Sequence, residues 1–509
     1  MKKILLLLIL AIAAFFVWQT ASTPEKTNKL VVSGPFEFHG IDLSKDGSVF
    51  SRLGVTQSLT GLLPDGSIEP VLAKSWTQNE AGTVWTFEIR DGVTFHNGER
   101  LTARDVVASL THARTQPGII KNVPIKSISA NGMTVTIELE SAYRPLLSTL
   151  AHFTLGVVSA DSFEKEGGLS VLNGTGPFSV ASMVAPHKLT LNKFAQYWGT
   201  PASIDVVEYQ AGHRSESRAL QVQSGQADIA YSIDAISKQA LLSGDNAKVV
   251  SVSLPRTILI KVNNSHPLLE NVHARQAMSL ALDRTGIANS VLFAPGSEAY
   301  QLFNTNQSAW HLDNLANKQD IEKAHSLLAG LGWTMNDQGV LEKDGTTFRL
   351  NLITYANRPE LPMVATALQN QLAKVGIQVD VSIENSSAIP SGHHDGSLNL
   401  AIIARNFGMA GTPLPLIYSD FSRPEGSDWG HMNWSNAQLS DNLEKLISTS
   451  AEDVNHQYEQ DTARILAENL PVIPVAYSTQ HTAVNSKLSG LVLDPFELNY
   501  RLEGLKFND

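Results

Sequence analysis

The stretch FRLNLITYANRPELPMVATALQNQLAKVGIQVDVSI, residues 348–383, decides the fold class of this chain. A strand is predicted around 348–354, and Leu368, Leu372 and Val375 then form the apolar stripe of a helix. Gly376 is a typical helix stop, and another strand is predicted at 378–383. This order of elements predicts an α/β fold. In such sheets ligands bind beyond the carboxyl ends of the strands.

A further strand follows this unit and ends in a permanent cation. Residues Leu398 to Ala404 are apolar except for Asn399, which predicts a buried strand, and Arg405 comes directly after them. A glycine-rich loop continues from there, within ARNFGMAGTPLP at 404–415. An arginine at the carboxyl end of a buried strand lies where an α/β sheet binds its ligand, so Arg405 is the first candidate ligand contact.

The composition bounds the class of protein. A chain of 509 residues is too long for one ordinary core, so about two or three lobes are expected. Hydrophobic residues make up 43% and charged residues 17%, which is typical of a globular protein. A formal net charge of −11 without basic runs argues against nucleic acid and anionic membranes as partners. The absence of cysteine excludes disulfides, thiolate metal sites and cysteine nucleophiles.

The N-terminus predicts export. Lys2 and Lys3 precede fifteen apolar residues, Ile4 to Trp18, and small polar residues follow, as in a secretory signal. The apolar run is short for a transmembrane helix, which needs about 20 residues. No cysteine follows it, so we expect a periplasmic protein that is not a lipoprotein. An uncleaved N-terminal anchor is the alternative.

Signatures of catalysis are missing from the sequence. It contains no G-x-S-x-G, no H-E-x-x-H and no P-loop, and NGTGPF at 173–178 lacks the third glycine of a dinucleotide fingerprint. The adjacent His393 and His394 fall in a polar stretch between predicted strands, where a structural or solvated role is the better interpretation. We therefore expect a protein that is not an enzyme and has no resident cofactor.

Several stretches together resemble one family. They are LAKSWT (72–77), WTFEIRDGVTFHNGERLTARDVVASL (85–110), NGTGPFSV (173–180), NKFAQYWG (192–199), LQVQSGQADIA (220–230), VHARQAMSLALDR (272–284), IEKAHSLLAGLGW (321–333) and LQNQLAKVGIQV (368–379). In order and spacing they are similar to the extracytoplasmic solute-binding proteins of peptide, nickel and opine-metal ABC importers. The resemblance covers roughly residues 30–505.

This resemblance implies a bilobal periplasmic-binding-protein fold with two α/β lobes and a hinge. The expected boundaries are 1–26 for the signal peptide, 27–262 plus 477–509 for lobe I, and 263–476 for lobe II, with an extra subdomain inserted in lobe I at about 60–160. It implies a monomer that does no chemistry. The protein would close on a small-molecule ligand and pass it to the membrane permease of an ABC transporter.

The resemblance also bears on the ligand. Peptide-binding members usually carry an aspartate-containing stretch at the place of Arg405, where it receives the ligand's ammonium. An arginine repels an ammonium and attracts a carboxylate. Nickel and opine-metal binders resemble this sequence in having an arginine there. The expected ligand is therefore a metal chelate with carboxylates, such as nickel or another transition metal with a histidine- or opine-type metallophore. The alternative is an oligopeptide or dipeptide.

Further ligand contacts are expected around Arg405. A second arginine of the nickel-chelate binders has no match in 151–163, so Arg114 or Arg144 is the candidate substitute. His431 would complete the coordination of a chelated metal, because imidazole suits nickel, zinc, copper and cobalt. The remaining candidate lining residues are Asn406, Phe407, Thr412 and Trp429. An enzyme or a transcription-linked sensor on this fold is a third, less favoured reading.

Overall fold

The computed structural model describes residues 28–508 apart from 165–167, 243–246, 314, 316–317, 357, 359, 409, 423–428, 431 and 450–455. The predicted signal segment and His431 therefore lie outside the described residues. Within the described part, no helix is long and apolar enough to cross a membrane.

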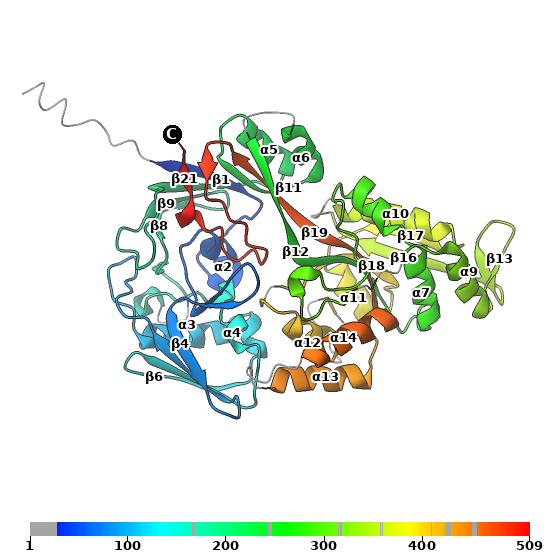
Figure 1. Cartoon of the computed structure of the whole chain (residues 1–509), viewed down its shortest axis with the longest axis horizontal. Coiled ribbons are helices and arrows are strands. Elements are labelled where there is room, and N and C mark those ends of the chain that lie inside the picture. Colours follow the sequence, from blue (N-terminus) through cyan, green and yellow to red (C-terminus); the bar gives the residue numbers. More distant parts are fainter. Residues whose placement is uncertain are drawn as a thin grey trace, which may run out of the picture.

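One large sheet runs through the whole molecule (Figure 1). Its strands, in spatial order, are β17 (Gln378–Ile383), β16 (Arg349–Thr354), β18 (Leu400–Asn406), β12 (Ala247–Val262), β19 (Val472–Asn485), β11 (Ile229–Ile233), β1 (Lys29–Gly34), β10 (Val206–Ala211), β9 (Lys188–Lys193) and β8 (Phe178–Val184). The long strands β12 and β19 pair with each other and pass from one half of the molecule to the other. They form the physical connection between two lobes.

The strand directions bring two sets of carboxyl ends together. β10, β1 and β11 are parallel, and β11 is antiparallel to β19. β17, β16 and β18 are parallel, and β18 is antiparallel to β12. Because β12 and β19 are themselves antiparallel, the two parallel sets run in opposite directions. Each set points its carboxyl ends toward the junction between the lobes, which is where such sheets bind ligands.

Three large hydrophobic cores divide the chain. The core of lobe I takes residues between Leu30 and Tyr231 and between Val484 and Leu505. That of an inserted subdomain takes residues from Leu59 to Val157. The core of lobe II takes residues from Ile258 to Val475. Each fully buried Leu, Ile, Val or Phe contributes about 1.5–3 kcal/mol of burial free energy, so each core stabilises its own part of the chain.

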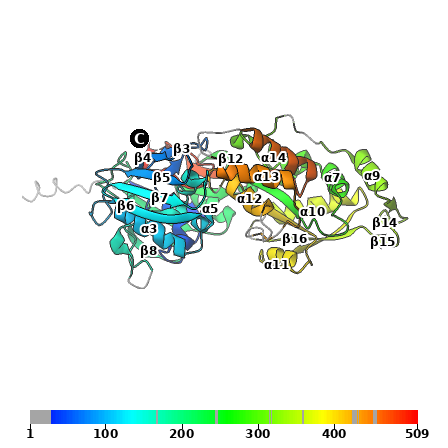
Figure 2. The ribbon, with the colours of Figure 1, turned by 90° about the horizontal axis from the view of Figure 1, so that it is seen from below.

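The helices and short elements complete the lobes. Lobe I also holds α2 (Leu43–Arg52), β2 (Thr60–Leu62), β3 (Ile68–Pro70), η3 (Ala160–Ser162), α5 (Ser215–Gln223), α6 (Ala235–Leu241), β20 (Leu488–Ser489), η6 (Leu502–Gly504) and β21 (Lys506–Phe507). The subdomain is a sheet of β4 (Ala73–Gln78), β5 (Val84–Ile89), β7 (Thr134–Leu139) and β6 (Ile125–Asn131), with α3 (Ala103–Thr115), η1 (Ile119–Asn122), α4 (Leu146–Thr149) and η2 (Phe153–Leu155). Figure 2 shows it on the lobe I side of the molecule.

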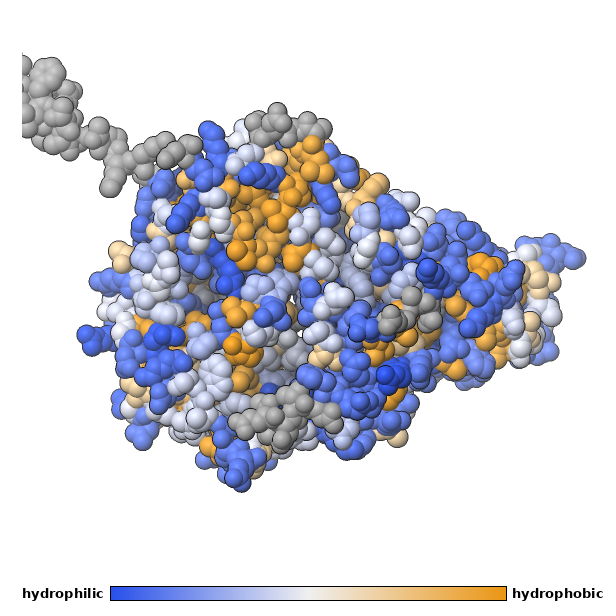
Figure 3. Space-filling model, in the orientation of Figure 1, coloured by the Kyte–Doolittle hydropathy of each residue, from blue (hydrophilic) through white to orange (hydrophobic). Residues whose placement is uncertain are grey.

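Lobe II carries most of the long helices. They are α7 (Val272–Ala281), α9 (Ile321–Gly330), α10 (Glu360–Ala373), α12 (Leu414–Phe421), α13 (Ala437–Ser448) and α14 (His456–Asn469). Its shorter elements are α8 (Arg284–Gly286), η4 (Ile287–Val291), η5 (Thr305–Gln307), β13 (Thr334–Met335), β14 (Leu341–Lys343), β15 (Thr346–Thr347) and α11 (Ala388–His394). Figure 3 shows a largely hydrophilic face on both lobes, with apolar residues gathered over the region of α5 and α6.

The structure confirms the strand–helix–strand unit and corrects its neighbours. β16, α10 and β17 match the predicted strand, helix and strand, and Gly376 follows α10 with a positive φ of 79°. β18 runs on to Asn406, so Arg405 lies inside the strand, paired with Thr257 of β12, and not after it. His393 and His394 end the short helix α11, where a loop was expected.

Candidate functional site

The two lobes touch at the junction. The backbone N–H of Arg144, in the subdomain, donates to the carbonyl of Ile447 in α13 at 2.9 Å. The Ile447 side chain packs against the subdomain core. On the other side, Gly411 approaches Leu62 of β2 so closely that a Cβ at Gly411 would lie 2.7 Å from the Leu62 side chain. The lobes are therefore in contact at two places.

Arg405, the first sequence candidate, is buried and already paired. Its Nε and Nη2 donate to Oδ2 and Oδ1 of Asp420 in α12, at 3.0 and 2.6 Å. Only 4% of Arg405 and 3% of Asp420 is exposed. Lys261 lies in the same cluster, where burial lowers the pKa of its ammonium to about 7, Asp420 opposes this and Arg405 adds to it. The two hydrogen bonds that Arg405 was expected to donate to a ligand carboxylate are thus donated to the carboxylate of Asp420.

The two candidate substitute arginines also have protein partners. Arg114 lies in the last turn of α3, and its guanidinium donates to the carbonyl of Ile125 at the start of β6, at 2.8 Å. Both partners belong to the inserted subdomain. Arg144 pairs with Glu459 of α14, Nη2 to Oε1 at 3.0 Å, and so bridges the subdomain and lobe II. Both guanidinium groups thus have protein partners, and their contact with a ligand stays a prediction.

The four remaining candidates fall into three settings. Phe407 is 2% exposed and packs edge-on against Phe303, with ring centroids 5.6 Å apart, so it belongs to the lobe II core. Asn406 and Thr412 accept backbone N–H groups of their own loop. Trp429 is half-buried and stacks on Tyr355, which follows the carboxyl end of β16.

A different set of charges lies at the junction. We call it the arginine cluster, and it consists of Arg52, Arg256, Arg358 and Glu497. Arg256 Nη2 donates to Oε2 of Glu497 at 2.5 Å, and Arg52 Nε donates to the Glu497 carbonyl at 2.7 Å. Burial by itself raises the pKa of the Glu497 carboxyl. The positive charges of Arg256, Arg52 and Arg358 outweigh burial and hold this pKa below its usual range.

The cluster draws on every part of the junction. Arg52 ends α2 in lobe I, and its guanidinium lies 4.1 Å from the centre of the Phe36 ring. Arg256 lies in β12, where its pairing with β19 is irregular between Ser253 and Thr257. Arg358 follows the carboxyl end of β16 in lobe II. Positive charges from lobe I, a crossing strand and lobe II therefore act on one carboxylate.

Several polar atoms of this region have no partner among the described residues. They include the buried Nη1 of Arg52, Nε of Arg256 and the hydroxyl oxygens of Tyr231 and Tyr500. The two tyrosine rings stack with centroids 3.7 Å apart, and burial raises the pKa of Tyr500 to about 12. Buried donors without acceptors are costly. The arrangement suits a ligand that brings acceptor oxygens.

The sequence contains one signal for this cluster. Arg358 follows a predicted strand of the α/β unit, at the same kind of position as Arg405. Arg52, Arg256 and Glu497 carry no such signal, because each comes from a different part of the chain and only the tertiary fold brings them together.

The part of the chain that the structure describes contains no metal site formed by protein side chains alone. No group of three or more histidine, aspartate or glutamate side chains there is arranged to hold a metal ion. His431 is outside the described residues.

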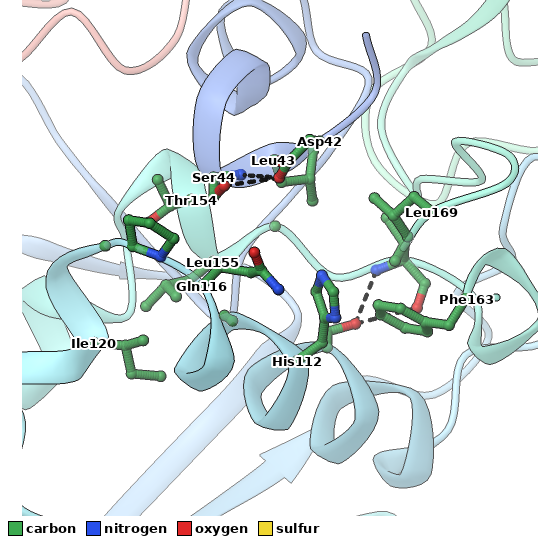
Figure 4. Close-up of a pocket in the computed structure, with 16 residues that line it drawn as sticks. Asp42, Leu43, Ser44, His112, Gln116, Ile120, Thr154, Leu155, Phe163 and Leu169 are labelled. Carbon is green, nitrogen blue, oxygen red and sulfur yellow. Dashed lines mark hydrogen bonds between the residues drawn. The ribbon is translucent and has the colours of Figure 1, made fainter. Parts of the chain in front are cut away.

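A separate pocket lies within lobe I and its subdomain, away from these charges (Figure 4). It has an empty volume of about 400 Å³, open mouth included, between the start of α2 and the end of α3. Leu43, Leu155 and Phe163 give it apolar walls, and His112 and Gln116 border it. None of the arginine-cluster residues lines it.

Comparison with known proteins gives the family. The model of the bacterial extracellular solute-binding proteins, family 5, matches residues 67–427. The nickel-binding protein NikA of Staphylococcus aureus is 27% identical over 88% of this chain and 89% of its own length. The oligopeptide-binding protein AppA of Bacillus subtilis is 25% identical over 95% of this chain and 92% of its own length.

Solved structures agree. NikA from Staphylococcus aureus in complex with Ni(L-His)2 has a TM-score of 0.78 at 25% identity and covers 94% of this chain and all (100%) of that one. NikA from Brucella suis in complex with Fe(III)-EDTA has a TM-score of 0.84 at 21% identity, with the same coverage. The bilobal fold and the family resemblance predicted from the sequence are thereby confirmed. The chain belongs to the bacterial extracellular solute-binding proteins, family 5.

Proposed function

We propose that this protein captures a carboxylate-bearing chelate of a transition metal between its lobes and delivers it to an ABC importer. The observation that carries this proposal is the arginine cluster with its unpartnered donors, Arg52 Nη1 and Arg256 Nε. A guanidinium binds a carboxylate through parallel charge-assisted bonds, and it repels the ammonium of a peptide. The metal is cargo and is held by the chelator.

The relatives support nickel as the metal. The protein of Staphylococcus aureus is a nickel-binding protein whose structure holds Ni(L-His)2, and that of Brucella suis holds Fe(III)-EDTA. Both complexes pair a metal ion with chelators that carry carboxylates. A peptide remains the alternative ligand, because AppA is an oligopeptide-binding protein of similar identity. The charge of the arginine cluster favours the chelate.

Capture follows from the placement of the three arginines. Arg52 comes from lobe I, Arg358 from lobe II and Arg256 from the crossing strand β12. A ligand that accepts hydrogen bonds from all three makes contacts that exist only when the lobes are together. Its binding therefore shifts the population toward the closed state, with β12 and β19 as the hinge.

The cellular setting follows the sequence features. The family is extracellular by description, and the N-terminal segment of this chain has the layout of a secretory signal. We propose export, removal of that segment, and a monomer that works in the periplasm beside a membrane permease. No step of this function makes or breaks a covalent bond.

Calorimetric titration of the mature protein tests the proposal. The ligands are Ni(L-His)2, free Ni²⁺, free L-histidine and a mixture of short peptides. We expect Ni(L-His)2 to bind best. Arg256→Ala and Arg358→Ala should each weaken it by about 10- to 100-fold, since a charge-assisted bond is worth about 1.5–3 kcal/mol.

The matched control is Arg349→Ala. Arg349 pairs with Asp380 on the surface of lobe II, with 60% of its side chain exposed, so its loss should leave affinity unchanged. Tight binding of peptides with no binding of Ni(L-His)2 would show that the ligand is a peptide and not a metal chelate. Unchanged affinity in both cluster variants would remove the arginine cluster from the site.

A further inference from the structure

Glu497 has an unusual place for a carboxylate. It is 8% exposed, and its backbone φ of 59° lies in the left-handed region that residues other than glycine and asparagine avoid. Asp494 holds the loop in this shape by accepting the backbone N–H groups of Phe496, Leu498 and Asn499 at 2.8–3.0 Å. A strained, buried residue persists only where the surroundings over-determine it, and such residues cluster at ligand sites.

The charges around Glu497 do not cancel. The positive charges of three guanidinium groups act on one buried carboxylate. Glu360 is the other acidic group at the cluster; its Oε1 lies 3.8 Å from Nη1 of Arg358, at the more exposed edge. Three positive and two negative groups leave a formal surplus of one positive charge. Without Glu497 the surplus would be two.

We propose that Glu497 is a specificity-determining residue that sets the charge of the accepted ligand, and this rests on the proposed capture of metal chelates. By pairing with Arg256 and neutralising part of the positive charge of the cluster, it favours a ligand of low net charge with few free carboxylates. It thereby disfavours strongly anionic chelates, because the negative charge of the Glu497 carboxylate would repel them in a poorly hydrated site. Specificity of this kind uses repulsion of the wrong ligand as well as attraction of the right one.

A purely structural role predicts something different. If Glu497 only anchors the loop, a glutamine of the same shape would accept the Arg256 hydrogen bond and preserve the anchor. Ligand preference would then stay unchanged. If Glu497 sets the charge, Glu497→Gln changes preference while leaving the shape of the site intact.

The experiment compares two nickel chelates by calorimetric titration: Ni(L-His)2, which is neutral overall, and Ni-EDTA, which is doubly anionic. We expect Glu497→Gln to shift the affinity ratio toward Ni-EDTA by about tenfold or more relative to wild type. Glu459→Gln is the matched control, because Glu459 is also a buried inter-lobe glutamate paired with an arginine but lies outside the cluster. It should leave the ratio unchanged. Arg358→Gln should shift the ratio the opposite way, toward Ni(L-His)2.

The outcomes separate this inference from the proposed function. An equal ratio in wild type and Glu497→Gln overturns the role of Glu497 while chelate capture stands. If wild type binds neither chelate, chelate capture fails, and a metal-free measurement decides on Glu497. Citrate, a tricarboxylate, should then raise the melting temperature of Glu497→Gln more than that of wild type, whereas acetate should affect both alike. Equal citrate effects overturn the inference. Should Glu497→Gln not fold, the affinity ratio of the two chelates in Arg358→Gln is the deciding measurement. A shift toward Ni(L-His)2 supports selection by charge, and no shift or the opposite shift overturns it.

Discussion

Arg405 and Asp420 form a two-bond ion pair in the interior of lobe II, with N–O distances of 3.0 and 2.6 Å. β18 supplies the arginine and α12, fifteen residues later, turns back to supply the aspartate. The two hydrogen bonds and the attraction between the charges offset the cost of removing both groups from water. Removing one partner leaves the other charge uncompensated in the protein interior.

Arg405→Ala should therefore destabilise the ligand-free protein by about 3–5 kcal/mol, because it strands the Asp420 carboxylate. The double variant Arg405→Met with Asp420→Leu should recover most of that loss, since apolar residues of similar volume replace the pair. Urea unfolding of the apo protein measures both. Native stability in Arg405→Ala together with weakened chelate binding would restore Arg405 as the ligand contact that the sequence predicted.

Arg405 shows which features could be predicted from the sequence and which could not. β16, α10 and β17 could be predicted because periodicity and a stop glycine are local signals. β18 was also recognised, although it runs two residues past the predicted end at Ala404. Whether its arginine faces a ligand or an internal acid depends on how α12 folds back. No local pattern encodes that choice. The arginine cluster was missed for the same reason: residues 52, 256, 358 and 497 meet only through the tertiary fold.

The N-terminal segment gives a prediction about export. We expect the exported protein to lack about 20–27 residues, as a cleaved secretory signal requires. Intact-mass analysis of protein from a periplasmic extract measures this. A mass that includes Met1 through Trp18, in the membrane fraction, would show an anchored protein instead.

His152 gives a prediction about pH. Burial, and then the charge of Arg52, lower the pKa of His152 to about 4 from an ordinary value of 6.5. Above pH 6.5 the ring is neutral in both the folded and the unfolded chain, so its contribution is constant. As the pH falls from 6.5 to 4, the unfolded chain binds a proton that the folded chain refuses. Folding then loses up to about 3 kcal/mol.

His152→Asn should remove that loss while keeping an acceptor for the N–H of Thr154, which His152 Nδ1 now receives at 3.3 Å. Free energies of unfolding at pH 7.5 and pH 4.5 should differ by less in the variant than in wild type. Parallel pH curves for the two proteins would contradict the low pKa of His152.

Arg144 and Glu459 supply the last prediction, because they hold the lobes together without touching the arginine cluster. Only 16% of the Arg144 side chain and 5% of the Glu459 side chain is exposed, and His456 Nδ1 lies 2.7 Å from Oε2 of Glu459. Such a pair stabilises only the closed state. Arg144→Ala should therefore weaken the binding of Ni(L-His)2 by about tenfold, mostly through faster dissociation.

A double-mutant cycle distinguishes an effect of Arg144 through its ion pair with Glu459 from direct contact of Arg144 with the ligand. If Arg144 acts through Glu459, Arg144→Ala should have little further effect in a Glu459→Gln background, with a coupling energy of about 0.5–3 kcal/mol. Lys445→Ala is the control, since Lys445 pairs with Asp441 on the surface of α13, and its loss should leave affinity unchanged. A full loss of affinity on Arg144→Ala in the Glu459→Gln background would instead place Arg144 against the ligand, because its effect would then be independent of its protein partner.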